Sequence, residues 1–300
     1  MRIRFNRIGQ MNPWLLVLPA FLILLVFNIF PLIWSLGMSF YNFSLNIREP
    51  PRYVGSLNYL SLLTSPETWD RIARTGLYLI YSLGLQLALA LIISLLLFEE
   101  FKGRRVLITL FMIPLMIAPI ASALIFRYLF DETLGPVNNF LSSTFGVRPL
   151  WFSNEISPLG LPYAMLSIIM VETWIWTPFI MFLLLAGMSS IPLDLLEQWR
   201  VDALRFHHKF RYVILPYVKP MLAIALIFRF MDALKTFDTV YILTGGGPGA
   251  TTELLSMYIY KLAFERWDFG KATALSYLVL IIVIFMTNVL LRYVYTREGE

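Results

Sequence analysis

Residues 197–216, EQWRVDALRFHHKFRYVILP, form a polar and strongly basic stretch between two apolar regions of the chain, residues 164–188 and 221–242. Apolar side chains recur within the stretch at helical spacing, with charged side chains between them. Apolar regions of this length are long enough to cross a bilayer as helices. The stretch is therefore expected to connect two membrane spans.

The composition agrees with a membrane protein. Of the 300 residues, 58% are hydrophobic and only 14% are charged, which lies outside the range of soluble globular domains. The formal net charge of +5 would suggest nucleic acid in a soluble chain, but here the bases fall mostly between apolar runs and set membrane orientation. We therefore expect an all-α integral membrane protein in a lipid bilayer, with no nucleic acid bound. The absence of cysteine excludes disulfides and thiolate metal sites.

The apolar runs predict six transmembrane helices and an uncleaved first span. Lys and Arg are more frequent in the segments between spans that are expected inside than in the longer outer segments, so both termini are predicted to be cytoplasmic. One transmembrane domain, residues 14–292, then lies between cytoplasmic ends 1–13 and 293–300 and contains a cytoplasmic loop, 189–220. The predicted spans are residues 14–40, 77–98, 106–130, 164–188, 221–242 and 272–291.

Prolines interrupt two of these spans. Pro31 is expected to bend the first span. Pro114 and Pro119 in the third span free backbone carbonyls, which indicates packing against neighbours or a cavity rather than lipid. Arg127, near the outer end of that span, either snorkels to the membrane surface or lies in a permeation path.

Ionisable residues inside the spans are the candidates for a substrate pathway. Arg229, Asp232 and Lys235 are spaced by three, so they can share a helix face. They are either a mutually paired structural cluster or the polar wall of an aqueous pathway, and Glu172 is judged in the same way. Trp176 follows Glu172 by four residues, and its ring either packs in the bundle or stacks on a sugar.

A glycine-rich turn, residues 244–252, contains Gly245, Gly246, Gly247 and Pro248. It lacks the Gly-Lys-Ser/Thr ending of a phosphate-binding loop and is expected outside, away from cytoplasmic ATP. Its glycines permit a tight turn, which is either structural or touches a substrate or a partner.

The histidines offer no catalytic or metal site. His207 and His208 are adjacent, so they point to different faces of a helix, and no ligand stands four residues away. The sequence therefore predicts neither a metal site nor an enzyme.

The basic stretch itself begins as an amphipathic helix. Leu196, Trp199 and Ala203 belong to its apolar stripe, opposite Glu197, Arg200 and Asp202. Such a helix either lies on lipid or inserts into a groove of a partner, and the interleaved acids favour a partner. A second short helical piece, containing Phe210, is expected to end at Pro216.

These residues resemble a known family. Glu197, Asp202, Phe210, Leu215 and Pro216 match the coupling-loop signature of ABC importer membrane subunits. The glycine turn and the segments that begin at Gly55 and Gly135 resemble the carbohydrate-uptake branch, in the subunit type of the larger maltose-transporter permease. The family's glycine after the aspartate is replaced by Ala203, and Trp199 is bulkier than the usual alanine.

The resemblance implies a type I importer permease bundle in the cytoplasmic membrane of a prokaryote. Residues 194–203 would dock in an ATPase, with Glu197 paired to a base of that subunit. Expected partners are a second related permease, two ATPase subunits, an extracytoplasmic solute-binding protein and a carbohydrate or polyol substrate. ATP and magnesium would belong to the ATPase, and this chain would bind no cofactor. The alternative is an ion-coupled secondary transporter that uses Glu172 or Asp232.

Overall fold

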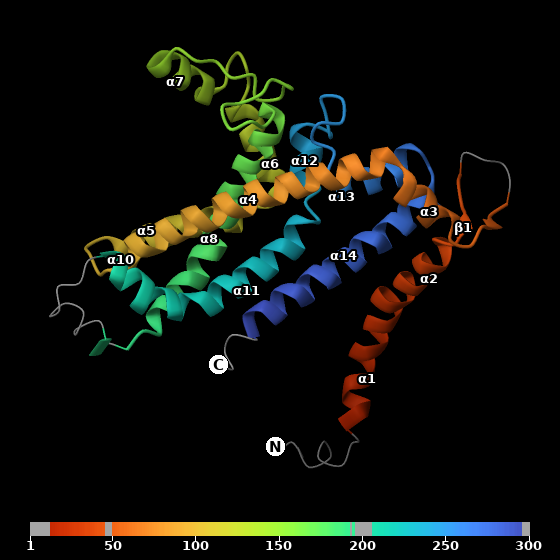
Figure 1. The fold of residues 1–300 in the computed structure, drawn as a ribbon, viewed down its shortest axis with the longest axis horizontal. Helices are drawn as coiled ribbons and strands as arrows, with labels where there is room; N and C mark the ends of the chain where they lie inside the picture. The colour runs from red at the N-terminus through yellow and green to blue at the C-terminus, as the bar shows by residue number, and fades with distance from the viewer. Residues whose placement is uncertain (1–12, 46–49, 193, 196–205, 296–300) are drawn as a thin grey trace, which may run out of the picture. The chain divides into compact units, whose positions relative to one another are not determined.

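The computed structural model describes residues 13–45, 50–192, 194–195 and 206–295. The chain divides into two compact units, residues 1–65 with 259–279 and residues 66–258 with 280–300. Both units are mainly helical (Figure 1). The last helix, α14 (Phe269–Tyr295), begins in the first unit and ends in the second.

The first unit contains the predicted first span. This span consists of α1 (Pro13–Leu24), a π-helical segment η2 (Leu25–Ile29) and α2 (Phe30–Met38). The π-helical segment ends two residues before Pro31, whose missing N–H and ring disturb the regular α-helical bonding of the preceding turn. Within Val17–Met38 no residue is buried, and the mean hydropathy reaches 2.4, which suits a helix surrounded by lipid.

The rest of the first unit is small. A two-stranded antiparallel sheet pairs Tyr41 with Tyr53, and Asn58 ties it to the preceding helix through bonds of 2.9 Å from its side-chain amide to the carbonyls of Ser39 and Tyr41. The elements here are β1 (Tyr41–Asn42), β2 (Arg52–Tyr53), α3 (Leu57–Thr64), the end of α13 (Leu255–Tyr260) and η4 (Lys261–Glu265).

The second unit is built around α8. This helix packs against α4, α5 and α11, and 67% of its apolar window is buried, the highest share of the apolar helices in the described part of the chain. The elements of this unit are α4 (Pro66–Phe98), α5 (Arg104–Met116), α6 (Pro119–Leu129), α7 (Pro136–Phe145), α8 (Tyr163–Ser189), α10 (Phe206–His208), η3 (Lys209–Ile214), α11 (Leu215–Ala233) and α12 (Asp238–Leu243).

A glycine allows α8 and α11 to approach closely. A Cβ atom at Gly187 would lie 3.0 Å from the Met221 side chain and 3.1 Å from the Tyr217 carbonyl oxygen. Around this contact, Leu184 and Met188 of α8 pack with Val218 of α11 in one buried apolar cluster. The small residue thus brings the two helices near enough for side chains further along them to meet.

Two helices differ in extent or continuity from the predicted spans. The second predicted span, 77–98, lies within α4, which begins at Pro66. Proline fits the first turn of a helix, and the ion pairs of Arg71 with Glu67 and Arg74 with Asp70, four residues apart, stabilise the added turns. The third span, 106–130, is two helices that meet at an angle of 99° between Met116 and Pro119, because the backbone there has left the helical conformation.

The fifth helix also differs from expectation. Pro216 does not end a short helical piece: the chain is helical from Phe206 to Ala233. The six-residue π-helical segment η3 precedes Pro216, and this wider turn places the proline at the second position of α11, where its missing N–H is tolerated. The helix ends at Ala233, so residues 234–242 of the predicted span form a turn and α12.

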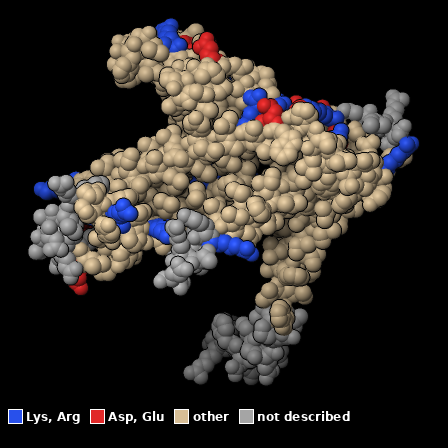
Figure 2. Space-filling view, viewed as in Figure 1, with Lys and Arg blue, Asp and Glu red and all other residues tan. Residues whose placement is uncertain are grey.

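The described residues include five helices long and apolar enough to cross a membrane, or six if α5 and α6 are one broken span. Figure 2 shows a largely uncharged surface on which Lys, Arg, Asp and Glu gather in small groups. The helical fold class predicted from the sequence is confirmed.

Candidate functional site

A polar cavity of about 170 Å³ lies in the second unit where α8, α11 and α12 meet the start of α6. Four of the five substrate-pathway candidates from the sequence line it. The lining residues are Pro119, Glu172, Trp176, Asp232, Lys235, Thr236, Phe237, Asp238 and Thr239.

Arg229 is the centre of the charged cluster behind this wall. Its side chain is 1% exposed, and its Nη1 donates to Asp232 Oδ2 at 2.6 Å. Its Nη2 lies 3.6 Å from Glu172 Oε2, and its Nε donates to Gln86 Oε1 at 3.0 Å. Arg229 therefore joins residues from α4, α8 and α11.

The two carboxylates next to Arg229 differ in environment. Glu172 is 3% exposed, and its Oε1 also accepts a hydrogen bond of 2.6 Å from Thr239 Oγ1. Asp232 is 41% exposed and faces the cavity. A buried carboxylate requires a cation or several donors, so Arg229 is needed mainly by Glu172.

One face of the Trp176 ring is in contact with Arg229. The guanidinium carbon of Arg229 lies 4.3 Å from the centroid of the Trp176 ring, a distance that allows a cation–π interaction. Trp176 also lines the cavity, so it connects the buried arginine with the open space.

The structure combines the two interpretations of the charged residues in this helix. Arg229 and Asp232 are paired, whereas the exposed Lys235 has no acidic partner within 4.0 Å in the part of the chain that the structure describes. Lys235 and Asp232 line the cavity. The cluster is thus paired internally and polar toward the cavity. Arg127 is not a lining residue: its Nη1 donates to the Ile242 carbonyl at 2.7 Å.

The glycine turn is closed upon itself. Gly245, Gly246 and Gly249 have φ angles of 62°, 87° and 63°, which residues with a side chain rarely adopt. The Thr244 and Thr252 hydroxyls lie 2.7 Å apart and join the two ends of the turn. Gly247 and Pro248 belong to the same turn, and none of its residues lines the cavity.

Most residues predicted to contact an ATPase lie outside the described part of the chain: Leu196, Glu197, Trp199, Arg200, Asp202 and Ala203. Of the others, Phe210 lies in η3 and packs against the apolar cluster, and Leu215 and Pro216 begin α11. Beside Phe210, the buried Lys209 has its Nζ 3.5 Å from Glu99 Oε1 at the end of α4.

Sequence reasoning did not find the residues of α4 that contact the site. Gln86, which bonds to Arg229, and Tyr78, whose hydroxyl lies 3.0 Å from Thr236 Oγ1, are both fully buried. Tyr78, Ser82 and Gln86 recur at helical spacing in an otherwise apolar run. This spacing could have indicated a polar stripe on one face of the helix.

The arrangement suits binding rather than catalysis. Carboxylates, a lysine and threonine hydroxyls surround a space next to an aromatic ring, which is the set of groups that binds hydroxyl-rich molecules. Over the described ranges, no group of three His, Cys, Asp or Glu residues could hold a metal ion.

Comparisons with known proteins agree with this architecture. Residues 86–297 match the family described as binding-protein-dependent transport system inner membrane component. The chain is 35% identical over 280 residues to the trehalose/maltose transport system permease protein of Thermococcus litoralis, covering 93% of this chain and 92% of that protein.

Two solved structures share the fold. One is a bacterial ABC transporter involved in the import of the acidic polysaccharide alginate, with a TM-score of 0.79, 22% identity and coverage of 94% of both chains. The other is a bacterial alginate ABC transporter in complex with an alginate pentasaccharide-bound periplasmic protein, with a TM-score of 0.77, 22% identity and coverage of 92% of this chain and 91% of that chain.

A polar cavity among long apolar helices is typical of membrane transport proteins. The chain belongs to the family of binding-protein-dependent transport system inner membrane components. It has the type I ABC importer permease fold and is a multi-pass permease subunit, not an enzyme. The resemblance drawn from the sequence is confirmed, and the alternative of an ion-coupled secondary transporter is set aside.

Proposed function

We propose that this chain forms half of the translocation pathway of an ATP-driven importer for an uncharged sugar or polyol, in the cytoplasmic membrane of a prokaryote. The other half comes from a second, related permease. A solute-binding protein outside delivers the substrate, and two ATPase subunits, which hold ATP and magnesium, bind on the cytoplasmic side. Both termini are cytoplasmic in this arrangement, and residues 14–292 form the transmembrane domain.

The observation that carries the proposal is the cavity wall made by Glu172, Trp176, Asp232 and Lys235. The carboxylate of Asp232 accepts hydrogen bonds from sugar hydroxyls, Lys235 donates to them, and Trp176 offers an apolar ring surface. The name of the Thermococcus relative, which specifies trehalose and maltose, supports a sugar.

The charged residues around the cavity favour an uncharged substrate. Arg229 already lies against two carboxylates, so its charge is not available to an anion. Asp238 adds a third acid to the wall, and Lys235 is the only base that lines the cavity in the described part of the chain. An anionic polyol would approach more acidic than basic groups, and this costs free energy in a poorly hydrated space.

Coupling to the ATPases is assigned to the loop 194–216. Glu197, Leu196, Trp199, Arg200, Asp202 and Ala203 would contact the ATPase. Phe210, Leu215 and Pro216 continue into α11, the helix that carries Arg229 and Asp232. Movement of the loop would therefore be transmitted along one continuous helix to the cavity.

The test is uptake by proteoliposomes that contain this chain with the permease, ATPases and binding protein encoded beside it. Maltose and trehalose are the probes, and glycerol 3-phosphate is the anionic comparison. We expect ATP-dependent uptake of at least one sugar and none of the anion. Uptake of the anion alone, or uptake that requires a proton gradient and no ATP, would overturn the proposal.

Asp232→Asn tests the cavity in the same proteoliposomes, with ATP hydrolysis as the measurement. The variant should change the sugar concentration that half-maximally stimulates ATP hydrolysis, because it alters an acceptor on the wall. The matched control is Glu132→Gln, an exposed acid in the loop after α6. Equal behaviour of Asp232→Asn, Glu132→Gln and the unaltered protein would remove Asp232 from the substrate site.

A further inference from the structure

One face of α4 carries a buried polar stripe. Successive members are separated by four, three, four and four residues, so they lie along one side of the helix. Arg71 is 9% exposed, Thr75 is 2% exposed and the other three are fully buried. We call these residues the α4 polar stripe: Arg71, Thr75, Tyr78, Ser82 and Gln86.

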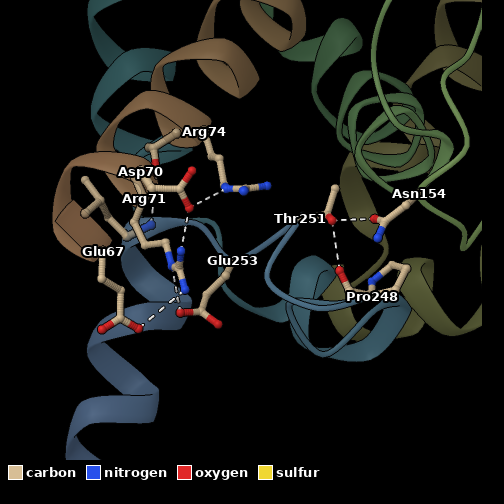
Figure 3. A network of polar contacts seen from close by, with 10 residues as sticks. Glu67, Asp70, Arg71, Arg74, Asn154, Pro248, Thr251 and Glu253 are labelled. Atoms are coloured by element: carbon tan, nitrogen blue, oxygen red, sulfur yellow. Dashed lines mark hydrogen bonds and ion pairs between the residues drawn. The ribbon is translucent and has the colours of Figure 1, made fainter.

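The outer end of the stripe holds the segment that follows the glycine turn. Arg71 Nε donates to Glu253 Oε1 at 3.0 Å, and Glu253 is 4% exposed. One turn further along α4, Thr75 Oγ1 accepts a 3.0 Å hydrogen bond from the backbone N–H of Leu255. Figure 3 shows Arg71 of α4 and Glu253 pointing toward each other.

Further acids surround Arg71. Its Nη1 lies 2.5 Å from Asp70 Oδ2, and its Nη2 lies 3.4 Å from Glu67 Oε1. Arg74 also donates to Asp70 Oδ2, at 2.8 Å, but the structure gives it no contact with Glu253 (Figure 3). The two arginines therefore share an acid, and only Arg71 reaches the segment after the glycine turn.

The glycine turn connects Glu253 with α12, which contributes residues to the cavity wall. Its last residue, Thr252, directly precedes Glu253, and its first residue, Thr244, directly follows α12. The hydroxyls of Thr244 and Thr252 are joined, and Thr252 Oγ1 also donates to the Gly247 carbonyl at 2.8 Å. A second attachment comes from Thr251, whose hydroxyl bonds to Asn154 and to the Pro248 carbonyl (Figure 3).

The inner end of the stripe holds the cavity wall directly. Tyr78 bonds to Thr236, a lining residue. Gln86 donates from its Nε2 to Ser82 Oγ at 2.8 Å, and this bond directs its oxygen toward Arg229. The same helix face thus fixes both the outer segment and the arginine behind the wall, about 22 Å apart along the helix axis at 1.5 Å per residue.

We propose that Arg71 is a positioning residue for the substrate cavity: through Glu253 it fixes the glycine turn and α12, and thereby sets the affinity for substrate from outside the cavity. The inference rests on the proposed function, because it assigns a distant determinant to the same site. α12 contributes Asp238 and Thr239 to the wall, and Thr239 bonds to Glu172. Loss of the Arg71–Glu253 pair removes one of the attachments of the segment that carries these two residues, beside the bond of Thr75 to Leu255.

The first experiment measures uptake of maltose and trehalose in the complete transporter in proteoliposomes. Arg71→Gln and Glu253→Gln should each raise the half-saturating sugar concentration by about fivefold or more, within the range of coupling between sites, and leave the maximal rate less affected. The double variant should be no worse than either single variant, because both remove the same interaction. Arg71→Lys, which keeps the charge, should recover part of the affinity.

Arg74→Gln is the matched control. It removes a neighbouring arginine of the same helix that bonds to Asp70 but has no contact with Glu253 in the structure. It should leave the half-saturating concentration close to that of the unaltered protein. An equal effect of Arg74→Gln and Arg71→Gln, or a change only in the amount of folded protein, would overturn the proposal.

A second measurement does not depend on transport. The chain contains no cysteine, so Asp238→Cys provides a single thiol on the cavity wall. Its labelling by a membrane-impermeant maleimide should change in rate when Arg71→Gln is added and stay the same when Arg74→Gln is added. Unchanged labelling in both would refute the positioning role even if no sugar is transported, whereas failure of sugar uptake alone would refute the proposed substrate.

Discussion

Arg229→Met tests whether the buried arginine stabilises the site through Glu172. Methionine fills much of the arginine's apolar volume but leaves Glu172, which is 3% exposed, without its cation. At an effective dielectric constant of about 20, two unit charges 3.6 Å apart interact by about 4 to 5 kcal/mol. Asp232 is 41% exposed and keeps contact with water, so its share is smaller.

Two effects reduce the expected loss in the free energy of unfolding. Thr239 continues to donate to Glu172. The variant also avoids the free-energy cost of removing the arginine charge from water. We therefore expect Arg229→Met to lower the free energy of unfolding by about 3 kcal/mol, at the lower end of the range for breaking a buried pair. The assay is denaturant unfolding of the purified protein in detergent, followed by tryptophan fluorescence.

The double variant Arg229→Met/Glu172→Gln decides the cause. A neutral amide needs no cation, so the double variant should regain at least about half of the loss. Arg127→Met, at an exposed arginine that bonds to one carbonyl, is the control and should cost less than about 1 kcal/mol. If the double variant is as unstable as Arg229→Met, the loss arises from packing and the electrostatic explanation is wrong.

Three further predictions concern other parts of the chain. Trp176→Leu should raise the half-saturating sugar concentration about tenfold, the value of one lost aromatic contact, while Trp176→Phe should retain most of the affinity in the same uptake assay. The N–H groups of Leu134 and Thr133 lower the pKa of the Asp131 carboxyl below its usual 3.8. This carboxylate therefore stabilises its turn above the usual pKa and ceases to do so as the pH falls through the lowered pKa. The protection of the Thr133 amide, measured as its exchange rate relative to the intrinsic rate at the same pH, should therefore fall at that pH in the unaltered protein but not in Asp131→Ala. Glu197→Ala should reduce co-purification of the ATPase without reducing membrane insertion; undiminished assembly would contradict the coupling role.

The approximate positions of the long apolar helices were predictable because the hydropathy of a segment depends only on its own residues and not on its contacts. The ends of α4 and α11 were not. At α4, the predicted span begins at residue 77, but Glu67 and Arg71 pair along the helix, which already begins at Pro66. At α11, the apolar and charged residues gave no indication that the helix ends at Ala233 and that α12 begins at Asp238.

The sequence predicted which site residues lie together on one helix, but not which residues of different helices meet. The spacing of Asp232 from Arg229, and of Trp176 from Glu172, follows from the helical repeat. The meeting of Arg229 with Glu172 depends on the packing of α8 against α11, which Gly187 permits through a contact of backbone and side chain. Gln86 was overlooked because a single amide in an apolar run has no partner until the fold supplies Arg229.

The helical stretch that contains α11, Lys209–Ala233, has a mean hydropathy of 1.8, the lowest among the candidate spans in the described part of the chain, and its charged residues explain this value. A lone arginine in contact with lipid is costly, but Arg229 is enclosed by groups from three helices and none of its charge faces the hydrocarbon. The charges that weaken the hydrophobic signal of this helix therefore hold α4, α8 and α11 in register around the cavity. Asp232 belongs to both the cluster and the cavity wall, and it bonds to the same arginine that bonds to Gln86 of α4. If the proposed function holds, a substrate bound to Asp232 would be coupled through Arg229 to the arrangement of these helices.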